Sequence, residues 1–328
     1  MTAAALPPSA IPHALGGDEL RLMARVARLY YDDGLRQTAI AERLGLSQTR
    51  VSRLLKRALD TGLVRVTVLS VPGLESEIER ELQESFSLRQ AVVVDVDGPD
   101  VLPAIGASAA YHLETTIKSD QLVGVASRSR SVLSTVELMR PLTTRHGVRV
   151  VQVFGGIGDP SSTRQSNRLT ELLAERTRGE PVFLGSPALA ASATSAAAFV
   201  DDPHVRAAMG FYDQLDAAVV GLGVLDDDAI AARAGDPFSR SELEELRRAG
   251  AVGDVCFRFF DAEGQPVTTT IDQRIIGIHL QQLRSVPHCV CVAGGTHKTT
   301  AIRAALRAGF IDVLVTDRPT AECVVADI

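Results

Sequence analysis

The stretch CVCVAGGTHKTTAIRAALRAGFIDVLVT (residues 289–316) decides the fold of this chain. It begins with an apolar run, breaks at a glycine pair, continues as a helix-forming segment from about Thr299, and ends in a second apolar run over residues 311–316. Two short apolar runs on either side of a helix are typical of parallel strands joined by a crossover helix. The stretch therefore predicts an α/β fold in which strands and helices alternate.

Apolar runs of the same kind recur in the preceding part of the chain, each separated from the next by a helical stretch. These further predicted strands cover residues 91–96, 122–126, 148–154, 181–185, 216–223 and 255–260. Continuously apolar strands indicate a mostly parallel sheet covered on both faces, which is a doubly wound, Rossmann-like arrangement. The 328 residues, of which 45% are hydrophobic and 23% charged, allow such a core and leave room for a second domain.

Polar and glycine-rich segments follow the carboxyl ends of these strands, where parallel sheets bind their ligands. A serine- and arginine-rich loop follows the strand at 122–126 and directly precedes a helix, and a helix N-terminus with hydroxyl groups is a ready site for an anion. Glycines follow the strand at 148–154, and aspartates flank the strand at 255–260. The candidate ligand-binding residues are Ser127, Arg128, Ser129, Ser131, Gly155, Gly156, Asp254, Arg258, Asp261, Gly294, Gly295 and Lys298.

The segment around Lys298 matches a nucleotide-binding P-loop only in part. A P-loop requires Gly-x4-Gly-Lys-Ser/Thr, but positions 292 and 297, where the glycines should stand, hold Val292 and His297. The sequence therefore argues against an ATPase or GTPase. A single phosphate, held by Lys298 and the N-terminus of the following helix, is the preferred interpretation, and the alternative is a lysine that is simply solvated.

The first part of the chain has the pattern of a DNA-binding helix-turn-helix. A helical segment over residues 20–33 precedes QTAIAERLGLSQTRVSRLLKRALDTGLV (residues 37–64), in which Gly45 separates two short helices. Ser47 is well placed to cap the second helix, which in this motif enters the major groove of DNA. The alternating run VRVTV (residues 64–68) predicts a short strand that would form a wing.

The second helix of this motif leaves a polar and basic face after its apolar face is buried. Glutamine and arginine can bind base edges, while serine, threonine and lysine suit phosphates. The candidate DNA-binding residues are Gln37, Ser47, Gln48, Thr49, Arg50, Ser52, Arg53, Lys56 and Arg57. Residues 21–66 contain ten basic and four acidic residues, so this segment carries +6 and the rest of a chain of net charge −6 carries −12. That distribution favours double-stranded DNA as a partner over a small helical interaction domain with a charged face.

We expect four parts along the chain: a disordered tail (1–17), a winged helix-turn-helix domain (18–70), a linker or dimerisation helix (71–88) and an effector-binding and oligomerisation domain (89–328). The N-terminal residues lack the pattern of a secretory signal, and the longest weakly apolar run is too short to cross a membrane, so we expect a cytoplasmic protein without membrane contact. Cys289 and Cys291 are expected to be buried thiols rather than metal ligands, and no metal or cofactor is expected.

Several ordered blocks together point to a known family. They are YYDDGLRQTAIAERLGLSQTRVSRLLKRALDTGLV near the N-terminus and VGVASRSRSVLSTVELM, VVQVFGGIGDP, RLTELLAE, GAVGDVCFRFFDAEGQPV, DQRIIGIHLQQLR, VAGGTHKTTAIRAAL and VLVTD in the rest of the chain. With these blocks the chain resembles, over almost its whole length, the SorC family of bacterial sugar-binding transcriptional regulators.

The resemblance implies an effector domain similar in fold to ribose-phosphate isomerases and glucosamine-phosphate deaminases. Such a domain binds a phosphorylated sugar or polyol and thereby alters operator binding, usually in a tetramer. The resemblance further implies that the loop Ser127–Ser131 and Lys298 hold the phosphate of the effector, that Asp254 and Asp261 bind its hydroxyl groups, and that Arg258 either binds the effector or braces the site.

The chain departs from the family pattern at two places. Where similar relatives carry Ser-Trp-Ser-x-Thr, this chain has Ser127-Arg-Ser-Arg-Ser131, and Arg318 stands where an acidic residue usually follows Thr-Asp. An arginine in place of tryptophan removes a surface on which a sugar ring stacks and adds a charge that pairs with phosphate. The departures favour an effector that is smaller or more anionic than is common in the family.

Three functions remain to be weighed. A ligand-responsive regulator of a carbohydrate or polyol operon, acting as a homodimer or homotetramer, is the leading hypothesis. An isomerase- or deaminase-like enzyme fused to a DNA-binding domain would need a base near the reacting carbons, and His297 is the nearest candidate without the acidic partners that such chemistry needs. A DNA binder without a ligand would leave the glycine-ended strands without a purpose. The sequence thus favours the regulator and no catalytic residue.

Overall fold

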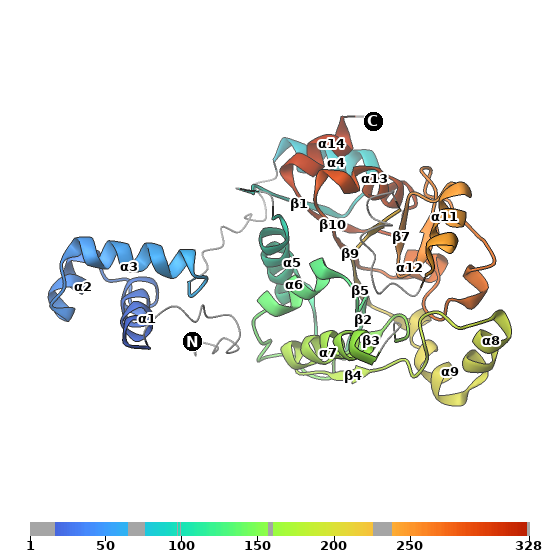
Figure 1. The fold of residues 1–328 in the computed structure, drawn as a ribbon, viewed down its shortest axis with the longest axis horizontal. Coiled ribbons are helices and arrows are strands. Elements are labelled where there is room, and N and C mark those ends of the chain that lie inside the picture. Colours follow the sequence, from blue (N-terminus) through green and yellow to red (C-terminus); the bar gives the residue numbers. More distant parts are fainter. Residues whose placement is uncertain are drawn as a thin grey trace. The chain divides into compact units, whose positions relative to one another are not determined.

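The computed structural model describes residues 17–64, 76–96, 98, 100–156, 160–225 and 238–326. The chain divides into a first unit, Met1–Val68, and a second unit, Leu69–Ile328 (Figure 1). Each unit has a hydrophobic core of its own. The predicted tail up to residue 16 and the predicted wing from residue 65 onward lie outside the described residues. The four domain limits named above stay predictions.

Within residues 17–64, the described part of the first unit, three helices form: α1 (Gly17–Tyr31), α2 (Gln37–Leu44) and α3 (Gln48–Asp60). Gly45 ends α2 with a left-handed φ of 64°, a conformation that glycine adopts without steric cost and that makes the sharp turn into α3. Apolar residues at helical spacing from all three helices pack together, among them Val26, Ile40 and Val51, each with no exposed surface. The helix-turn-helix prediction is confirmed.

Seven parallel strands form the central sheet of the second unit, in the order β1-β10-β9-β5-β2-β3-β4. Their bounds are Gln90–Val94 (β1), Leu122–Val125 (β2), Arg149–Gln152 (β3), Glu180–Val182 (β4), Ala217–Val220 (β5), Cys289–Val292 (β9) and Val313–Asp317 (β10). Each strand overlaps a predicted apolar run, and the doubly wound α/β fold is confirmed. From β2 the chain adds β3 and β4 on one side and then β5, β9 and β10 on the other, so the strand order reverses between β2 and β5.

Helices cover both faces of this sheet because successive strand residues point to opposite faces. On one face, Val92 and its equivalents pack with α5 (Leu102–Thr116), α6 (Arg130–Leu138) and α7 (Pro160–Thr177). On the other face, Val93 and its equivalents pack with α4 (Glu77–Phe86), α13 (Thr299–Arg307) and α14 (Arg318–Val325) (Figure 1). The remaining described helices are α8 (Ala193–Asp201), α9 (Pro203–Met209), α11 (Arg240–Arg248) and α12 (Leu280–Ser285), with short 3-10 turns η2 (Tyr212–Gln214), η3 (Asp272–Arg274) and η4 (Thr296–Lys298).

The predicted strand over residues 255–260 is wrong as a member of the central sheet. Gly253–Val255 (β7) and Arg258–Phe260 (β8) form an antiparallel hairpin, which pairs with β6 (Gly223–Val224) in a second sheet of order β6-β7-β8. Cys256 and Phe257 make the turn with left-handed φ values of 52° and 62°. Sequence alone hides this turn because such positions are usually held by glycine, asparagine or aspartate.

Helix α4 packs along β1, the edge strand of the central sheet. Glu79 Oε1 accepts a hydrogen bond from the Val93 N–H (2.8 Å), and Gln83 Oε1 accepts one from the Ala91 N–H (3.0 Å). The helix thereby satisfies backbone groups that an edge strand would otherwise offer to another chain. Leu82 of α4 is fully buried in the core of the second unit. Residues 77–86 therefore belong structurally to that unit, and their role in dimerisation stays a prediction.

Candidate DNA-reading helix and effector site

The exposed face of α3 carries most of the predicted DNA contacts. Arg50, Arg53 and Lys56 are exposed and spaced three residues apart, so they lie along one side of the helix. Gln48, Thr49 and Ser52 are also exposed. Side chains at the start of such a helix are the ones that reach base edges in helix-turn-helix proteins, and those farther along reach phosphates. The geometry supports the prediction that α3 is the DNA-reading helix.

Two of the predicted contacts, Ser47 and Arg57, also make hydrogen bonds within the first unit. Ser47 Oγ accepts the Arg50 N–H (3.2 Å) and caps α3. Arg57 Nη1 lies 2.6 Å from Glu19 Oε1 of α1, so its charge is partly compensated within the protein. Gln37, the first residue of α2, is half-buried.

In the second unit, two loops meet where the strand order reverses. Gly221, which follows β5, lies against the serine loop that follows β2. A Cβ atom on Gly221 would stand 2.1 Å from Ser129 Oγ and 3.0 Å from Ser131 Oγ. The Ser131 hydroxyl donates to the carbonyl of Val292 at the end of β9. The serine loop therefore contacts the carboxyl ends of both β5 and β9, and the crevice at a strand-order reversal is where doubly wound sheets bind ligands.

The serine loop places basic side chains at the N-terminus of α6. Ser129 caps this helix by accepting the Val132 N–H (3.3 Å), and Arg128 and Arg130 on either side of it are exposed. Ser127 is buried, and its Oγ accepts a hydrogen bond from Gln152 Nε2 (3.3 Å) at the end of β3. The positive end of the helix dipole and the arginine charges together favour an anion here.

Lys298 contacts the segment that contains Gly221. Its Nζ donates to the carbonyl of Leu222 (2.8 Å), the residue that directly follows Gly221. Lys298 is half-buried; it is the last residue of η4 and the residue that directly precedes α13. The ammonium group is thereby directed toward the same loop that contacts the serines, as expected for a group that shares one anion with them.

A buried aspartate fixes the glycine pair before Lys298. Asp317 Oδ2 accepts the Gly295 N–H (2.7 Å), and a Cβ atom on Gly294 would stand 2.4 Å from the same oxygen. Gly295 has a left-handed φ of 96°. Both glycines are therefore needed for the loop to approach the end of β10, and they shape the site through the backbone.

Asp254 lies close to this cluster. It pairs across the small sheet with Gly223, the residue after Leu222, and it is almost fully buried. Burial is the main cause that raises the pKa of the Cys256 thiol, and the Asp254 carboxylate is the next. Burial also raises the pKa of the Cys291 thiol to about 12, and the Lys298 charge limits this rise. The pairing of Asp254 with Gly223 and the bond of Lys298 to Leu222 place both charged residues beside consecutive residues of one segment.

Other predicted ligand contacts have backbone or bracing roles. The N–H of Gly155 donates to Ile276 (3.3 Å) and that of Gly156 donates to Ser186 (2.7 Å), so these amides are used within the protein. The Arg258 guanidinium is buried and makes five hydrogen bonds to the segment 272–278. Because arginine has five N–H donors, this pattern fits the bracing role and not a contact with an effector.

The Asp261 carboxylate makes hydrogen bonds within its own turn. Asp261 Oδ1 accepts the N–H groups of Glu263 (3.1 Å) and Gln265 (2.8 Å) in a tight turn. Gly264 of that turn lies against Ala304 and Ala308, at the C-terminal end of α13. Lys298 stands at the other end of this helix, which at 1.5 Å per residue is on the order of 13 Å long. The Asp261 carboxylate is thus used by backbone N–H groups of its own turn, and its contact with the effector stays a prediction.

Sequence reasoning missed several residues that shape the site. Gly221 and Leu222 lie within the predicted strand at 216–223 but follow β5 in the structure, and the close approach to the serine loop explains why a glycine stands at position 221. Asp317 ends β10 and holds the glycine pair, although in the sequence it is only an aspartate at the end of an apolar run. Gln152 is buried in β3, within a predicted strand. A position at a strand end is the signal that these four residues share, but only the order of the strands shows which ends meet.

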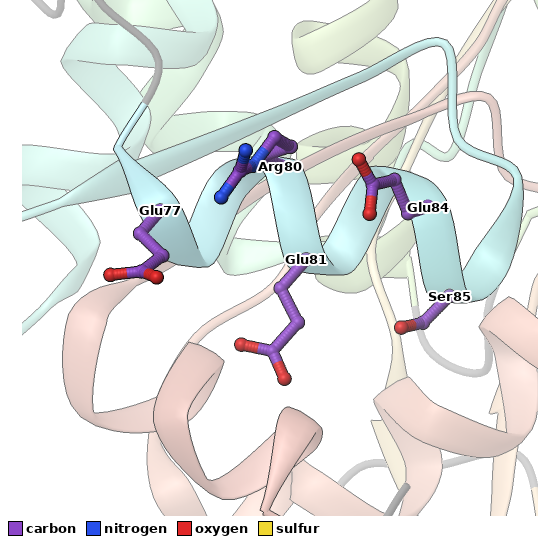
Figure 2. A pocket seen from close by; sticks show the side chains of 5 residues that line it. All are labelled: Glu77, Arg80, Glu81, Glu84 and Ser85. Atoms are coloured by element: carbon purple, nitrogen blue, oxygen red, sulfur yellow. The ribbon is translucent and has the colours of Figure 1, made fainter.

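The outer face of α4 has a surface hollow of a different character. Figure 2 shows its lining side chains, which all project from α4: Glu77, Arg80, Glu81, Glu84 and Ser85. These residues are exposed and none of them comes from a strand end of the sheet. The hollow is therefore separate from the candidate effector site.

Comparison with known proteins matches both units. Residues 72–326 match the family model described as "Putative sugar-binding domain", and residues 25–70 match the model of the MarR family. The chain is 32% identical to the deoxyribonucleoside regulator of Bacillus subtilis (strain 168) over 95% of this chain and 99% of that protein. It is 30% identical to the sorbitol operon regulator of Klebsiella pneumoniae over 93% of this chain and 98% of that protein.

A solved structure supports the same likeness. The full-length sorbitol operon regulator SorC from Klebsiella pneumoniae superposes with a TM-score of 0.69 at 29% identity, and the match covers 94% of this chain and all of that one. These relatives are regulators of transcription rather than enzymes. Among the described residues, no helix combines the length and the apolar character that crossing a bilayer requires.

Proposed function

Because the chain belongs to the SorC family of sugar-binding transcriptional regulators, we propose that it binds operator DNA through α3 and that a phosphorylated sugar or polyol, bound at the reversal of the strand order, alters this binding. The regulated genes would encode a catabolic route for that sugar or polyol. DNA as the partner implies that the protein acts in the cytoplasm.

One observation carries the proposal for the effector. The serine loop, Gly221 and Lys298 converge from three strand ends on one place, although they are distant in the sequence. Hydroxyl groups, a lysine and the N-termini of α6 and α13 are the groups that hold a phosphate. We assign the phosphate to this cluster and the hydroxyl groups of the effector to Asp254.

The DNA-reading role of α3 also favours a homo-oligomer. One helix-turn-helix reads one half-site, so two copies are needed for a symmetric operator. We therefore propose a homodimer or homotetramer in solution.

The experiment that tests the proposal combines DNA retardation with effector titration. DNA from upstream of the gene and of its neighbours is incubated with the wild type, with Lys298→Ala and with the Arg50→Ala/Arg53→Ala double variant, with and without a panel of sugar and polyol phosphates. Lys298→Ala should retain DNA binding but need at least about tenfold more effector, the equivalent of about 1.4 kcal/mol. The double variant should lose retardation.

Lys118→Ala is the matched control, because Lys118 is an exposed lysine that precedes β2 at the amino end of the sheet. It should respond to the effector as the wild type does. Retardation by the double variant equal to that of the wild type would refute the role of α3. An unchanged effector response in Lys298→Ala would refute the phosphate assignment.

A further inference from the structure

The Arg258 side chain is the most fully bonded cation of the described second unit. Its Nε donates to Ile278 O (3.0 Å), and its Nη1 donates to the carbonyl oxygen (3.3 Å) and Oδ1 (2.8 Å) of Asp272. Its Nη2 donates to Ile275 O (3.3 Å) and Gly277 O (3.2 Å). Only 4% of the side chain is exposed, so one guanidinium fastens the β7–β8 hairpin to the segment 272–278.

The segment 272–278 is itself part of the rigid body of the second unit. Ile278 donates its N–H to Val153 (2.7 Å), and Gly277 pairs with Phe154 just beyond β3. Ile276 donates its N–H to Ala188 (2.9 Å). The hairpin is therefore anchored, through Arg258, to the carboxyl end of a central strand.

The turn that Arg258 follows is conformationally unfavourable. Cys256 and Phe257 both have left-handed backbones, although neither is glycine, asparagine or aspartate. The Phe257 ring packs edge-on against Phe154 (5.0 Å between centroids) and Phe238 (5.4 Å). Such a conformation persists only where its surroundings enforce it, and the Arg258 contacts and the two rings are the groups that do so here.

The same turn orients the carboxylate of Asp254. Asp254 Oδ2 accepts the Phe257 N–H (3.3 Å), so the direction of this carboxylate depends on the left-handed turn. Asp254 also lies beside Gly223, next to the Leu222 carbonyl that holds Lys298. A shift of the turn would move the carboxylate relative to the lysine.

We propose that Arg258 is a positioning residue of the effector site: by fastening the Cys256–Phe257 turn to the segment 272–278 it holds the Asp254 carboxylate where it binds the hydroxyl groups of the effector. This inference rests on the proposed effector function. It implies that Arg258 governs affinity for the hydroxylated part of the effector and leaves the phosphate cluster at Ser129, Ser131 and Lys298 unaffected.

The test compares Arg258→Lys and the milder Asp272→Asn with the wild type by calorimetric titration. The probes are inorganic phosphate, ribose 5-phosphate and sorbitol 6-phosphate. Lysine has three donors on one atom and cannot bridge the same carbonyls. Arg258→Lys should lower the affinity for whichever sugar phosphate the wild type binds more tightly by roughly tenfold, while the affinity for inorganic phosphate should stay within about twofold. Asp272→Asn alters one of the five bonds and should have a smaller effect of the same kind. Arg284→Lys, which alters an arginine bonded to the Ala308 carbonyl, is the matched control and should change neither affinity.

A second measurement reports on the turn without any ligand. Cys256 is buried, so its rate of thiol alkylation, followed by peptide mass spectrometry, measures opening of the turn, with Cys289 of β9 as the internal reference. The rate at Cys256 should rise in Arg258→Lys relative to that at Cys289. If Arg258→Lys does not fold, Asp272→Asn carries both measurements.

Three results would overturn the inference. They are an unchanged sugar phosphate affinity, an equal loss of affinity for inorganic phosphate and sugar phosphate, and an unchanged alkylation rate at Cys256. Failure of the wild type to bind any sugar phosphate would instead refute the proposed effector class, and the alkylation rates would still decide whether Arg258 holds the turn.

Discussion

His112 and His288 form a hydrogen-bonded pair at the amino end of the sheet, away from the effector site. Their Nε2 atoms lie 3.0 Å apart, and Arg89 Nη1 lies 3.4 Å from His288 Nδ1. Arginine only donates hydrogen bonds, so His288 Nδ1 accepts, His288 Nε2–H donates, and His112 Nε2 accepts. This chain of donors requires both imidazoles to be neutral.

The pair predicts a loss of stability in acid. Burial is the main cause that lowers the pKa of His112 from 6.5 to about 4, and His288 is the second cause. Burial and then Arg89 lower the pKa of His288. Lys118 acts on His288 in the same direction, and Asp312 opposes the shift. A histidine with a lowered folded pKa stabilises the fold fully above pH 6.5, and that contribution is lost as the pH falls toward 4. From pH 7.5 to 5.0, His112 should account for a loss of about 2 kcal/mol in the free energy of unfolding.

Urea unfolding followed by circular dichroism at these two pH values measures the loss. His112→Gln should reduce the difference between the two pH values, because glutamine does not titrate. His146→Gln, which changes an exposed histidine, is the control and should keep the wild-type difference. An equal pH dependence in His112→Gln and in the wild type would contradict the assignment.

At the scale of single residues, position after a strand was enough to single out Ser129, Ser131 and Lys298. The same rule also singled out Asp261, whose carboxylate accepts backbone N–H groups of its own turn. It passed over Asp317, whose carboxylate shapes the glycine loop through a hydrogen bond to backbone. Residue type and local spacing predict which groups suit a ligand, whereas a bracing contact between distant strand ends leaves no local pattern.

At the scale of elements, α4 shows how a helix can protect a sheet edge. Glu79 accepts the Val93 N–H and, as the partner of Ser76 in a capping box, also accepts the Ser76 N–H (2.8 Å). Glu79→Ala should therefore lower the free energy of unfolding by about 1–3 kcal/mol, since it leaves buried N–H groups without a partner. Urea unfolding measures the change.

Glu81→Ala is the matched control on the same helix, because Glu81 is exposed and lines the outer hollow (Figure 2). It should change the free energy of unfolding by less than about 0.5 kcal/mol. Equal effects of the two substitutions would show that the edge contacts of Glu79 contribute nothing specific. A lower stability combined with self-association of Glu79→Ala would agree with an exposed strand edge.

The elements differ in how well their sequences predict them. Apart from β4, the parallel strands of the central sheet are largely buried and therefore read as continuous apolar runs, which makes them recognisable. The run VCFRFF (255–260) is as apolar, yet it folds into two short strands, because packing of Phe257 between Phe154 and Phe238 and the bonds of Arg258 outweigh the unfavourable turn. Tertiary contacts decide such a case, and they are not visible in a local window.

At the scale of the whole molecule, the sequence predicts two units but not the order in which the strands pair. That order places the ends of β2, β5 and β9 together, where we propose the effector site. The charge distribution, by contrast, can be read directly: a segment of +6 lies in a chain of −6. The average charge would argue against a nucleic acid partner, whereas the local charge argues for one.

The local charge predicts a steep salt dependence of DNA binding in spite of the negative net charge. Each cation that neutralises a phosphate contributes about −0.9 to the slope of log K against log salt concentration. Lys56→Ala should therefore make this slope shallower by about one. Arg53→Ala should do the same if Arg53 binds a phosphate. Arg57→Ala should change the slope less, because Glu19 already pairs with Arg57. The slopes are measured by fluorescence anisotropy with labelled operator DNA at salt concentrations between about 50 and 200 mM. Equal slopes for the wild type and Lys56→Ala would exclude Lys56 from the phosphate contacts. A larger change of the slope in Arg57→Ala than in Lys56→Ala would show that DNA displaces Glu19 from Arg57.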